Sequence, residues 1–197
     1  MPYQAVKKSR VEGSALALFA RNFFKYPSML GSVLPSSRFL VEDIITRIDW
    51  DRARVLVEFG PGVGTITREV LKRMRHDAVL VVIELNEEFV QYLNCSFSDP
   101  RLRIVHGSAE HVRRVLTEHG IAPADYIISS LPYSLLPEAL RHEIVAESRQ
   151  ALKPQGTLLV FQFNRALLPY LHASFSSVKL DVQFFNILPA LIFHCTR

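Results

Sequence analysis

Five short apolar runs, separated by longer stretches of helical period, constrain the fold of this chain more than any other feature. The runs are nearly continuous in aliphatic and β-branched residues, which is typical of parallel strands covered on both faces. They occupy residues 54–59, 78–84, 101–105, 125–129 and 157–163. Helical candidates lie between them, near 64–75, 86–97, 109–119 and 135–152. This alternation predicts an α/β fold with a doubly wound parallel sheet.

The chain after the fifth run predicts a reversal of strand direction. A short helix near 165–175 precedes two further apolar runs, at 178–186 and 190–195. Their connection is too short for a crossover helix, so we expect the two runs to pair as an antiparallel hairpin. Seven mostly parallel strands with an antiparallel C-terminal hairpin resemble the Rossmann-like fold of class I methyltransferases.

Composition and length indicate one globular core. The chain has 197 residues, of which 49% are hydrophobic and 21% are charged, and this composition excludes a disordered protein. We expect one compact unit over 49–197, preceded by N-terminal helices over 1–48, with a helix near 37–48. No run reaches the roughly 18 apolar residues that a membrane span needs, and the N-terminus lacks the apolar core of a secretory signal. We therefore expect a cytoplasmic protein.

Cysteine and histidine spacing gives no sign of a metal centre. Cys95 and Cys195 are the two cysteines, and they stand far apart in the sequence. His106 and His111 do not match a helical ligand pair. We expect no bound metal.

A glycine-rich loop follows the first predicted strand. Glu58, Gly60, Gly62 and Gly64 form the pattern E-x-G-x-G-x-G at a change from strand to helix, where ligands bind in open α/β sheets. The third glycine stands one place too early for the dinucleotide pattern G-x-G-x-x-G. The spacing resembles the first motif of S-adenosylmethionine-dependent methyltransferases. The alternative is a tight turn beside a solvated glutamate.

That resemblance implies a cofactor site across the ends of several strands. Glu84 ends the second predicted strand, where a carboxylate can accept the two ribose hydroxyls. After the third strand, Ser108 stands where the family often has an aspartate that contacts adenine. The residues expected to bind S-adenosylmethionine are Glu58, Gly60, Gly62, Gly64, Glu84, Leu85, Ser108, Ala109 and Ser130.

The fourth predicted strand runs into the sequence S-L-P-Y at 130–133. It resembles the N-L-P-Y loop of ribosomal RNA adenine dimethylases and, more closely, the S-G-L-P loop of bacterial phospholipid N-methyltransferases. Loop carbonyls can accept N–H bonds from an amine, and a tyrosine offers a ring face and a hydroxyl. Alternatively, Tyr133 packs in the pocket wall. The amine must also lose a proton, and the candidate proton acceptors are Tyr26, Tyr133 and water. The candidate catalytic residues are Ser130, Leu131, Tyr133 and Tyr26.

Both ends of the chain resemble the phospholipid enzymes. The segment 21–38 contains G-x-x-x-P-S-S-R, and 186–190 is similar to their N-x-P-P-A segment, with Leu188 in place of the first proline. The resemblance covers the chain from about residue 18 to the end. It implies an aminophospholipid substrate such as phosphatidylethanolamine.

The N-terminal 26 residues carry the whole net charge. They hold five basic residues against one acid, whereas the remainder is neutral. A helix near 14–26 with an apolar face and a basic face suits an anionic membrane surface; alternatively, it covers the cofactor as a lid. We expect peripheral association with the inner face of the membrane. The candidate membrane or headgroup contacts are Lys7, Lys8, Arg21, Lys25 and Arg38.

Three other functions remain open from the sequence. A soluble small molecule could replace the lipid as acceptor, or the fold could bind the donor without catalysis. Methylation of adenine in ribosomal RNA is the third, but Ser130 replaces the asparagine of the RNA enzymes. Their helical RNA-binding domain usually follows the seventh strand, beside which this chain ends. We therefore do not expect a nucleic-acid partner.

Overall fold

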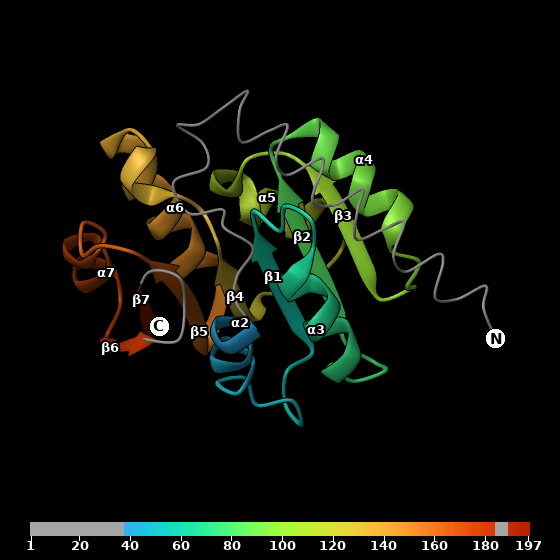
Figure 1. Ribbon diagram of the computed structural model, residues 1–197, viewed down its shortest axis with the longest axis horizontal. Coiled ribbons are helices and arrows are strands. Elements are labelled where there is room, and N and C mark those ends of the chain that lie inside the picture. Colours follow the sequence, from blue (N-terminus) through green and yellow to red (C-terminus); the bar gives the residue numbers. More distant parts are fainter. Residues whose placement is uncertain (1–37, 184–188) are drawn as a thin grey trace.

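The computed structural model describes residues 38–183 and 189–197, which form a sheet with helices on both faces (Figure 1). The sheet has seven strands in the order β3-β2-β1-β4-β5-β7-β6. Their bounds are β1 Val55–Phe59, β2 Val79–Glu84, β3 Leu102–His106, β4 Ala124–Ser129, β5 Leu152–Gln162, β6 Ser177–Gln183 and β7 Ala190–Thr196. The first five pair in parallel, and β7 pairs antiparallel with β5 and β6. The predicted α/β fold and its C-terminal hairpin are confirmed.

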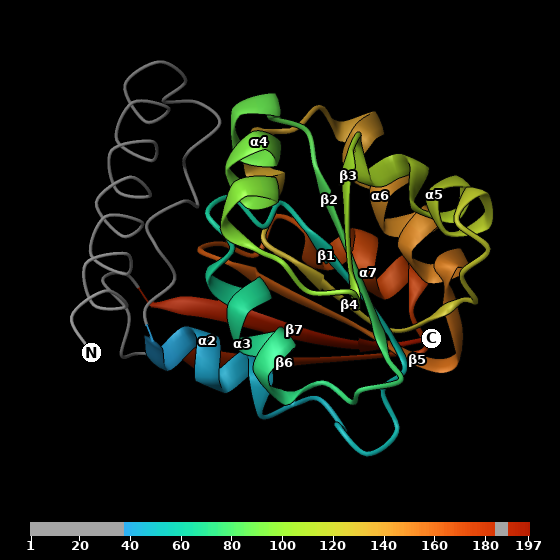
Figure 2. The same ribbon diagram turned by 90° about the vertical axis from the view of Figure 1, so that its right-hand side faces the viewer.

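Two layers of helices cover the sheet, one on each face (Figure 2). Leu40, Ile66 and Leu93 of α2, α3 and α4 belong to one apolar cluster, whereas Val112 and Ile144 of α5 and α6 belong to the other, together with buried residues of α7. The helices are α2 Arg38–Ile45, α3 Thr65–Arg73, α4 Glu87–Ser96, α5 Val112–Glu118, α6 Glu138–Ala151 and α7 Leu168–Ser174.

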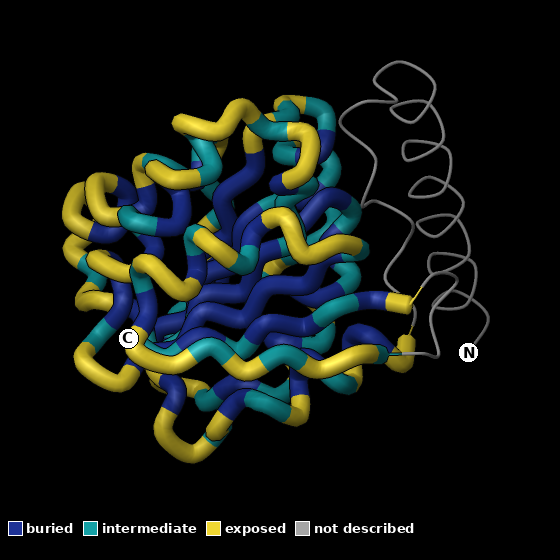
Figure 3. The backbone as a smooth tube through the Cα atoms, turned by 90° about the vertical axis from the view of Figure 1, so that its left-hand side faces the viewer, coloured by how far each residue is buried: buried dark blue, intermediate teal, exposed yellow. Residues whose placement is uncertain are grey.

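Alternation of side chains along the central strands joins these two clusters to the sheet. In β1, Leu56 packs with the cluster under α2, α3 and α4, and Val57 packs with the opposite cluster. All five residues of β1 are buried, and the central strands form the deeply buried part of the backbone in Figure 3. Because both faces are covered, these strands have no polar face toward solvent, and their sequences are nearly continuous apolar runs, with Glu58 as the exception in β1.

Several predicted boundaries differ from the structure. The fifth strand begins at Leu152 and not at 157, because the pairing with β4 shifts between Ala124 and Tyr126 and takes up a bulge. The expected helix over 135–152 begins only at Glu138, after a short 3₁₀ turn (η3, Tyr133–Leu135). The helix expected over 109–119 divides into a 3₁₀ turn (η2, Ala109–His111) and α5.

Helix α2 is anchored to the far edge of the sheet. Its buried residues pack on the same sheet face as α3. Arg47 pairs with Asp43 at 2.7 Å and with Asp181 of β6 at 2.5 Å. This part of the expected N-terminal segment therefore shares the core of the sheet. Within residues 38–183 and 189–197, no helix is long and apolar enough to cross a bilayer.

Candidate active site

The glycine bend between β1 and α3 has an unusual backbone. Gly60, Gly62 and Gly64 have φ values of 64°, 54° and 74°, in the left-handed region that glycine tolerates best. A methyl group added to Gly64 would lie 2.6 Å from the ring of Phe97, whereas at Gly62 it would meet no atom within 4 Å. The bend therefore turns sharply against α4 and leaves open space at its middle.

Glu84 lies beside this bend at the end of β2. Its Oε2 accepts a hydrogen bond from the Gly62 amide at 3.1 Å, and its Oε1 accepts one from the Asn86 amide at 2.9 Å. Burial raises the pKa of this carboxyl group, and the hydrogen bonds from the backbone amides oppose the rise by stabilising the charged form. The bend and the end of β2 are thus fixed to each other through one carboxylate.

The surroundings of Glu84 suit a ribose with a neighbouring base. Each carboxylate oxygen has a second lone pair for a ligand hydroxyl. Leu85 exposes 59% of its surface next to Glu84, which offers apolar area to a flat ring. His106 Nε2 lies 3.1 Å from the Leu85 carbonyl oxygen and joins the ends of β2 and β3. Together with the space at Gly62, these residues fit the adenosyl part of S-adenosylmethionine.

Glu58 is the second buried carboxyl group of the site. The Thr67 hydroxyl of α3 donates a hydrogen bond to its Oε2 at 2.6 Å. Burial raises its pKa to about 7, and the nearby charge of Glu84 adds to the rise. Sequence reasoning missed Thr67; its signal was a β-branched polar residue in the first turn of a helix directly after the glycine bend.

The S-L-P-Y loop after β4 is joined to both neighbouring strands. The Ser130 amide donates to the Phe59 carbonyl of β1 at 3.0 Å. The Leu131 carbonyl accepts from Gln162 Nε2 of β5 at 2.8 Å and from the Tyr133 amide at 2.9 Å. Sequence reasoning missed Gln162 as well; its signal was a polar residue at the end of an apolar run.

Tyr133 lies inside the core. It is 1% exposed, and its hydroxyl oxygen lies 3.1 Å from Ser129 Oγ. Burial raises the pKa of this phenol further above its ordinary value, so it stays protonated near neutral pH. This position fits the alternative that Tyr133 packs in the wall of the site, and its catalytic role stays a prediction.

Of the remaining predicted residues, the structure describes Ser108, Ala109 and Arg38 and does not describe the others. Ser108 and the buried Ala109 follow β3, and the neighbouring Gly107 amide donates to the Glu84 carbonyl at 3.0 Å. Arg38 begins α2 with its guanidinium 5.2 Å from the centre of the Phe39 ring. The others lie outside the described residues: Lys7, Lys8, Arg21, Lys25 and Tyr26.

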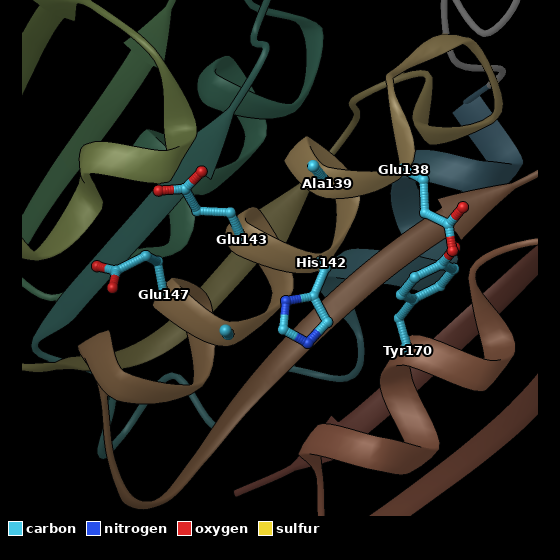
Figure 4. Close-up of a pocket in the computed structure, with 7 residues that line it drawn as sticks. Glu138, Ala139, His142, Glu143, Glu147 and Tyr170 are labelled. Atoms are coloured by element: carbon cyan, nitrogen blue, oxygen red, sulfur yellow. The ribbon is translucent and has the colours of Figure 1, made fainter.

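A separate groove of about 560 Å³ lies along α6 and α7 (Figure 4). Its lining includes Glu138, His142, Glu143, Glu147 and Tyr170, and none of these belongs to the glycine bend or the S-L-P-Y loop. Two of its acids have partners, since Glu138 accepts from the Tyr170 hydroxyl and Glu147 pairs with an arginine of α5. Within the described chain, no group of three or more candidate ligands is arranged to hold a metal.

Comparison with known sequences identifies a family and individual relatives. The family model for ribosomal RNA adenine dimethylase matches residues 25–166. An ornithine lipid N-methyltransferase from Singulisphaera acidiphila is 30% identical over 185 residues, which cover 90% of this chain and 94% of that protein. A ribosomal RNA small subunit methyltransferase A from Mycoplasma capricolum is 32% identical over 105 residues, which cover 51% of this chain and only 37% of that enzyme.

Solved structures share the fold at low sequence identity. The N-methyltransferase NodS from Bradyrhizobium japonicum, in complex with S-adenosyl-L-homocysteine, has a TM-score of 0.67 at 11% identity over 83% of this chain and 90% of that one. A precorrin-6y C5,15-methyltransferase from Geobacter metallireducens has a TM-score of 0.63 at 12% identity over 80% and 87% of the two chains. The chain therefore belongs to the ribosomal RNA adenine dimethylase family and is an S-adenosylmethionine-dependent methyltransferase, in agreement with its glycine bend and Glu84.

Proposed function

We propose that this enzyme methylates the amine nitrogen of a membrane lipid, an aminophospholipid such as phosphatidylethanolamine. The observation that carries the proposal is the extent of the match with a lipid N-methyltransferase, which covers 94% of that protein, against 37% for the ribosomal RNA enzyme of Mycoplasma capricolum. Ornithine and ethanolamine headgroups both present a primary amine. The proposal is therefore a lipid amine acceptor, with ethanolamine and ornithine as the headgroups to compare.

The residues of the site have distinct tasks in such a transfer. S-adenosylmethionine supplies a methyl group on a sulfonium, which is a good leaving group. Glu84 binds the ribose hydroxyls, and the glycine bend allows the backbone to approach the donor closely. The S-L-P-Y loop lies at the adjacent strand end, where it can orient the acceptor nitrogen. The main contribution of these residues is alignment of the two reacting atoms at about 3–3.5 Å with water excluded.

The charge distribution supports a membrane acceptor. Residues 1–26 hold five basic residues and one acid, and a basic segment is attracted to anionic lipid by about 1 kcal/mol per residue near the surface. We infer that this segment, which includes Lys7, Lys8, Arg21 and Lys25, brings the enzyme to the inner face of the membrane. These residues lie outside the part of the chain that the structure describes.

Adenine in ribosomal RNA is the second candidate acceptor, and the matched family model favours it. Its exocyclic amine would occupy the place of the lipid amine beside the S-L-P-Y loop. The donor site would be the same, so donor binding alone does not separate the two substrates.

The test uses the full chain with a methyl-labelled donor and three acceptors. Vesicles contain phosphatidylethanolamine or an ornithine lipid in an anionic background, and the third acceptor is undermodified small-subunit ribosomal RNA. We expect label in the lipid amine, none in vesicles of phosphatidylcholine alone, and loss of donor binding in Glu84→Gln. Label in RNA but in neither lipid would refute the lipid proposal.

A further inference from the structure

Gln162 is the last residue of β5. This strand ends on the side of the sheet where the glycine bend and the S-L-P-Y loop follow β1 and β4. Only 3% of its surface is exposed. Its Nε2 donates to the Leu131 carbonyl at 2.8 Å and to its neighbour's carbonyl, that of Phe161, at 2.5 Å. Both partners are acceptors, so the orientation of the side-chain amide follows from its contacts: the nitrogen faces the loop and the oxygen faces away from these two carbonyls.

The Leu131 carbonyl has no capacity left for a substrate. It accepts from Gln162 Nε2 and also from the Tyr133 amide at 2.9 Å, and a carbonyl oxygen has two lone pairs. The Leu131 carbonyl therefore cannot be the loop carbonyl that accepts an N–H bond from the amine. An amine that enters beside the loop needs another acceptor close by.

The oxygen of the same side-chain amide has that capacity. Among residues 38–183 and 189–197, none donates a hydrogen bond to Gln162 Oε1, and every fully buried side-chain polar atom described there has a partner. This oxygen therefore reaches the small part of Gln162 that solvent touches. Donation by Nε2 to two carbonyls polarises the amide and makes Oε1 a stronger acceptor.

We propose that Gln162 is a substrate-binding residue whose Oε1 accepts an N–H of the methyl acceptor while its Nε2 fixes the S-L-P-Y loop. This inference rests on the proposed N-methylation but not on the identity of the headgroup. A neutral amide suits the task, because it orients an amine without the strong preference for a protonated amine that a carboxylate would have. It also discriminates between acceptors with an N–H and a fully methylated nitrogen.

The test compares Gln162→Met, which keeps the length of the side chain and removes both hydrogen-bonding groups, with Gln91→Met on the exposed surface of α4. Donor affinity, measured by calorimetry, should equal that of the wild type in both variants. For Gln162→Met we expect kcat/KM on phosphatidylethanolamine to fall about 10- to 100-fold. Gln91→Met should stay within about twofold of the wild type.

Binding to two short-chain lipids separates substrate contact from loop support. With S-adenosylhomocysteine bound, Gln162→Met should weaken binding of a short-chain phosphatidylethanolamine by more than it weakens binding of the matching phosphatidylcholine, which has no N–H. Equal weakening of both, or of neither, would overturn the inference. If the wild type methylates RNA and no lipid, the lipid proposal fails and Gln162→Met is judged on adenine, where a loss below about threefold overturns the inference. Activity on neither acceptor contradicts both proposals.

Discussion

At the scale of single residues, the two buried carboxyl groups of the candidate site differ in their hydrogen-bond donors. Glu84 accepts from two backbone amides, whereas Glu58 accepts one hydrogen bond from the Thr67 hydroxyl. Burial raises the pKa of both groups, and backbone N–H groups oppose the rise at both: those of Gly62 and Asn86 at Glu84, and that of Thr67 at Glu58. Glu84 therefore has more backbone donors for its charged form and is the better prepared of the two to bind hydroxyls as a carboxylate.

Glu58 should make stability depend on pH. Its pKa rises from 4.5 in the unfolded chain to about 7 in the fold. Its contribution to the free energy of unfolding is therefore fully present below about pH 4.5 and is lost as the pH rises through about 7. Glu58→Gln removes this dependence. In urea unfolding without the donor, the wild type should lose on the order of 3 kcal/mol more than Glu58→Gln over that interval.

Thr67→Val provides the control for this effect. It removes a hydrogen bond that lowers the pKa of Glu58, so the loss of stability should move to higher pH. Parallel pH profiles for the wild type and Glu58→Gln would show that burial does not shift this group.

Gly64 and Gly120 separate backbone strain from steric overlap. Both have positive φ, 74° and 64°, but an added methyl group meets Phe97 only at Gly64 and has open space at Gly120. Gly120→Ala should lower the free energy of unfolding by about 1–2 kcal/mol, which is the cost of the left-handed conformation. Gly64→Ala should lose a further 1–3 kcal/mol, roughly the cost of overpacking. Equal losses in urea unfolding would contradict the contact with Phe97.

At the scale of elements, the start of α4 is coupled to the candidate cofactor site. The Asn86 side chain accepts from the Glu88 amide at 2.9 Å and the Phe89 amide at 3.4 Å, and its own amide donates to Glu84. The residue that begins the helix therefore also positions the carboxylate expected to bind ribose. The local sequence of this turn and the geometry of the site depend on the same few bonds.

Asn86→Ala should weaken both the helix and the donor site. Loss of the cap should lower the free energy of unfolding by about 1 kcal/mol, and donor affinity should fall because the turn beside Glu84 loosens. Asn94→Ala, which removes an exposed side-chain bond to the Val90 carbonyl later in α4, is the matched control and should leave donor affinity unchanged. Calorimetry that finds equal donor affinity in both variants would contradict the coupling.

At the scale of the whole molecule, the strand order places the site. Strands β2 and β3 lie on one side of β1, and β4 and β5 lie on the other side, so the strand order reverses at β1. The loops after β1 and β4 therefore meet at one edge, where parallel α/β sheets bind ligands. The antiparallel β7 lies beside β5, and β6 completes that half of the sheet at its edge.

The basic N-terminal segment should act separately from donor binding. Removal of residues 1–25 takes away the five basic residues of this segment, so cosedimentation with anionic vesicles should be lost while calorimetric donor affinity stays within about twofold. In the full chain, vesicle binding should weaken as salt increases, because screening shortens the electrostatic range. Loss of donor binding on deletion would instead support the lid alternative.

Sequence reasoning predicted the fold and the strand ends at which the candidate site residues lie, because continuous apolar runs and a glycine pattern are local signals. It did not predict the partners of Glu58 and Leu131, since Thr67 and Gln162 reach them from other elements. It also placed the start of the fifth strand too late, because the bulge opposite Ala124 depends on pairing with β4.

The amino-acid sequence by itself determined the α/β class, the seven strands and the glycine bend, since periodicity and backbone freedom act over neighbouring residues. Only the tertiary structure decided which groups are buried and which lone pairs are already occupied. Tyr133 lies in the core and the Leu131 carbonyl has two donors. Packing in the core and the hydrogen bond from Gln162 of β5 produce these features, and both depend on elements that are distant in the sequence.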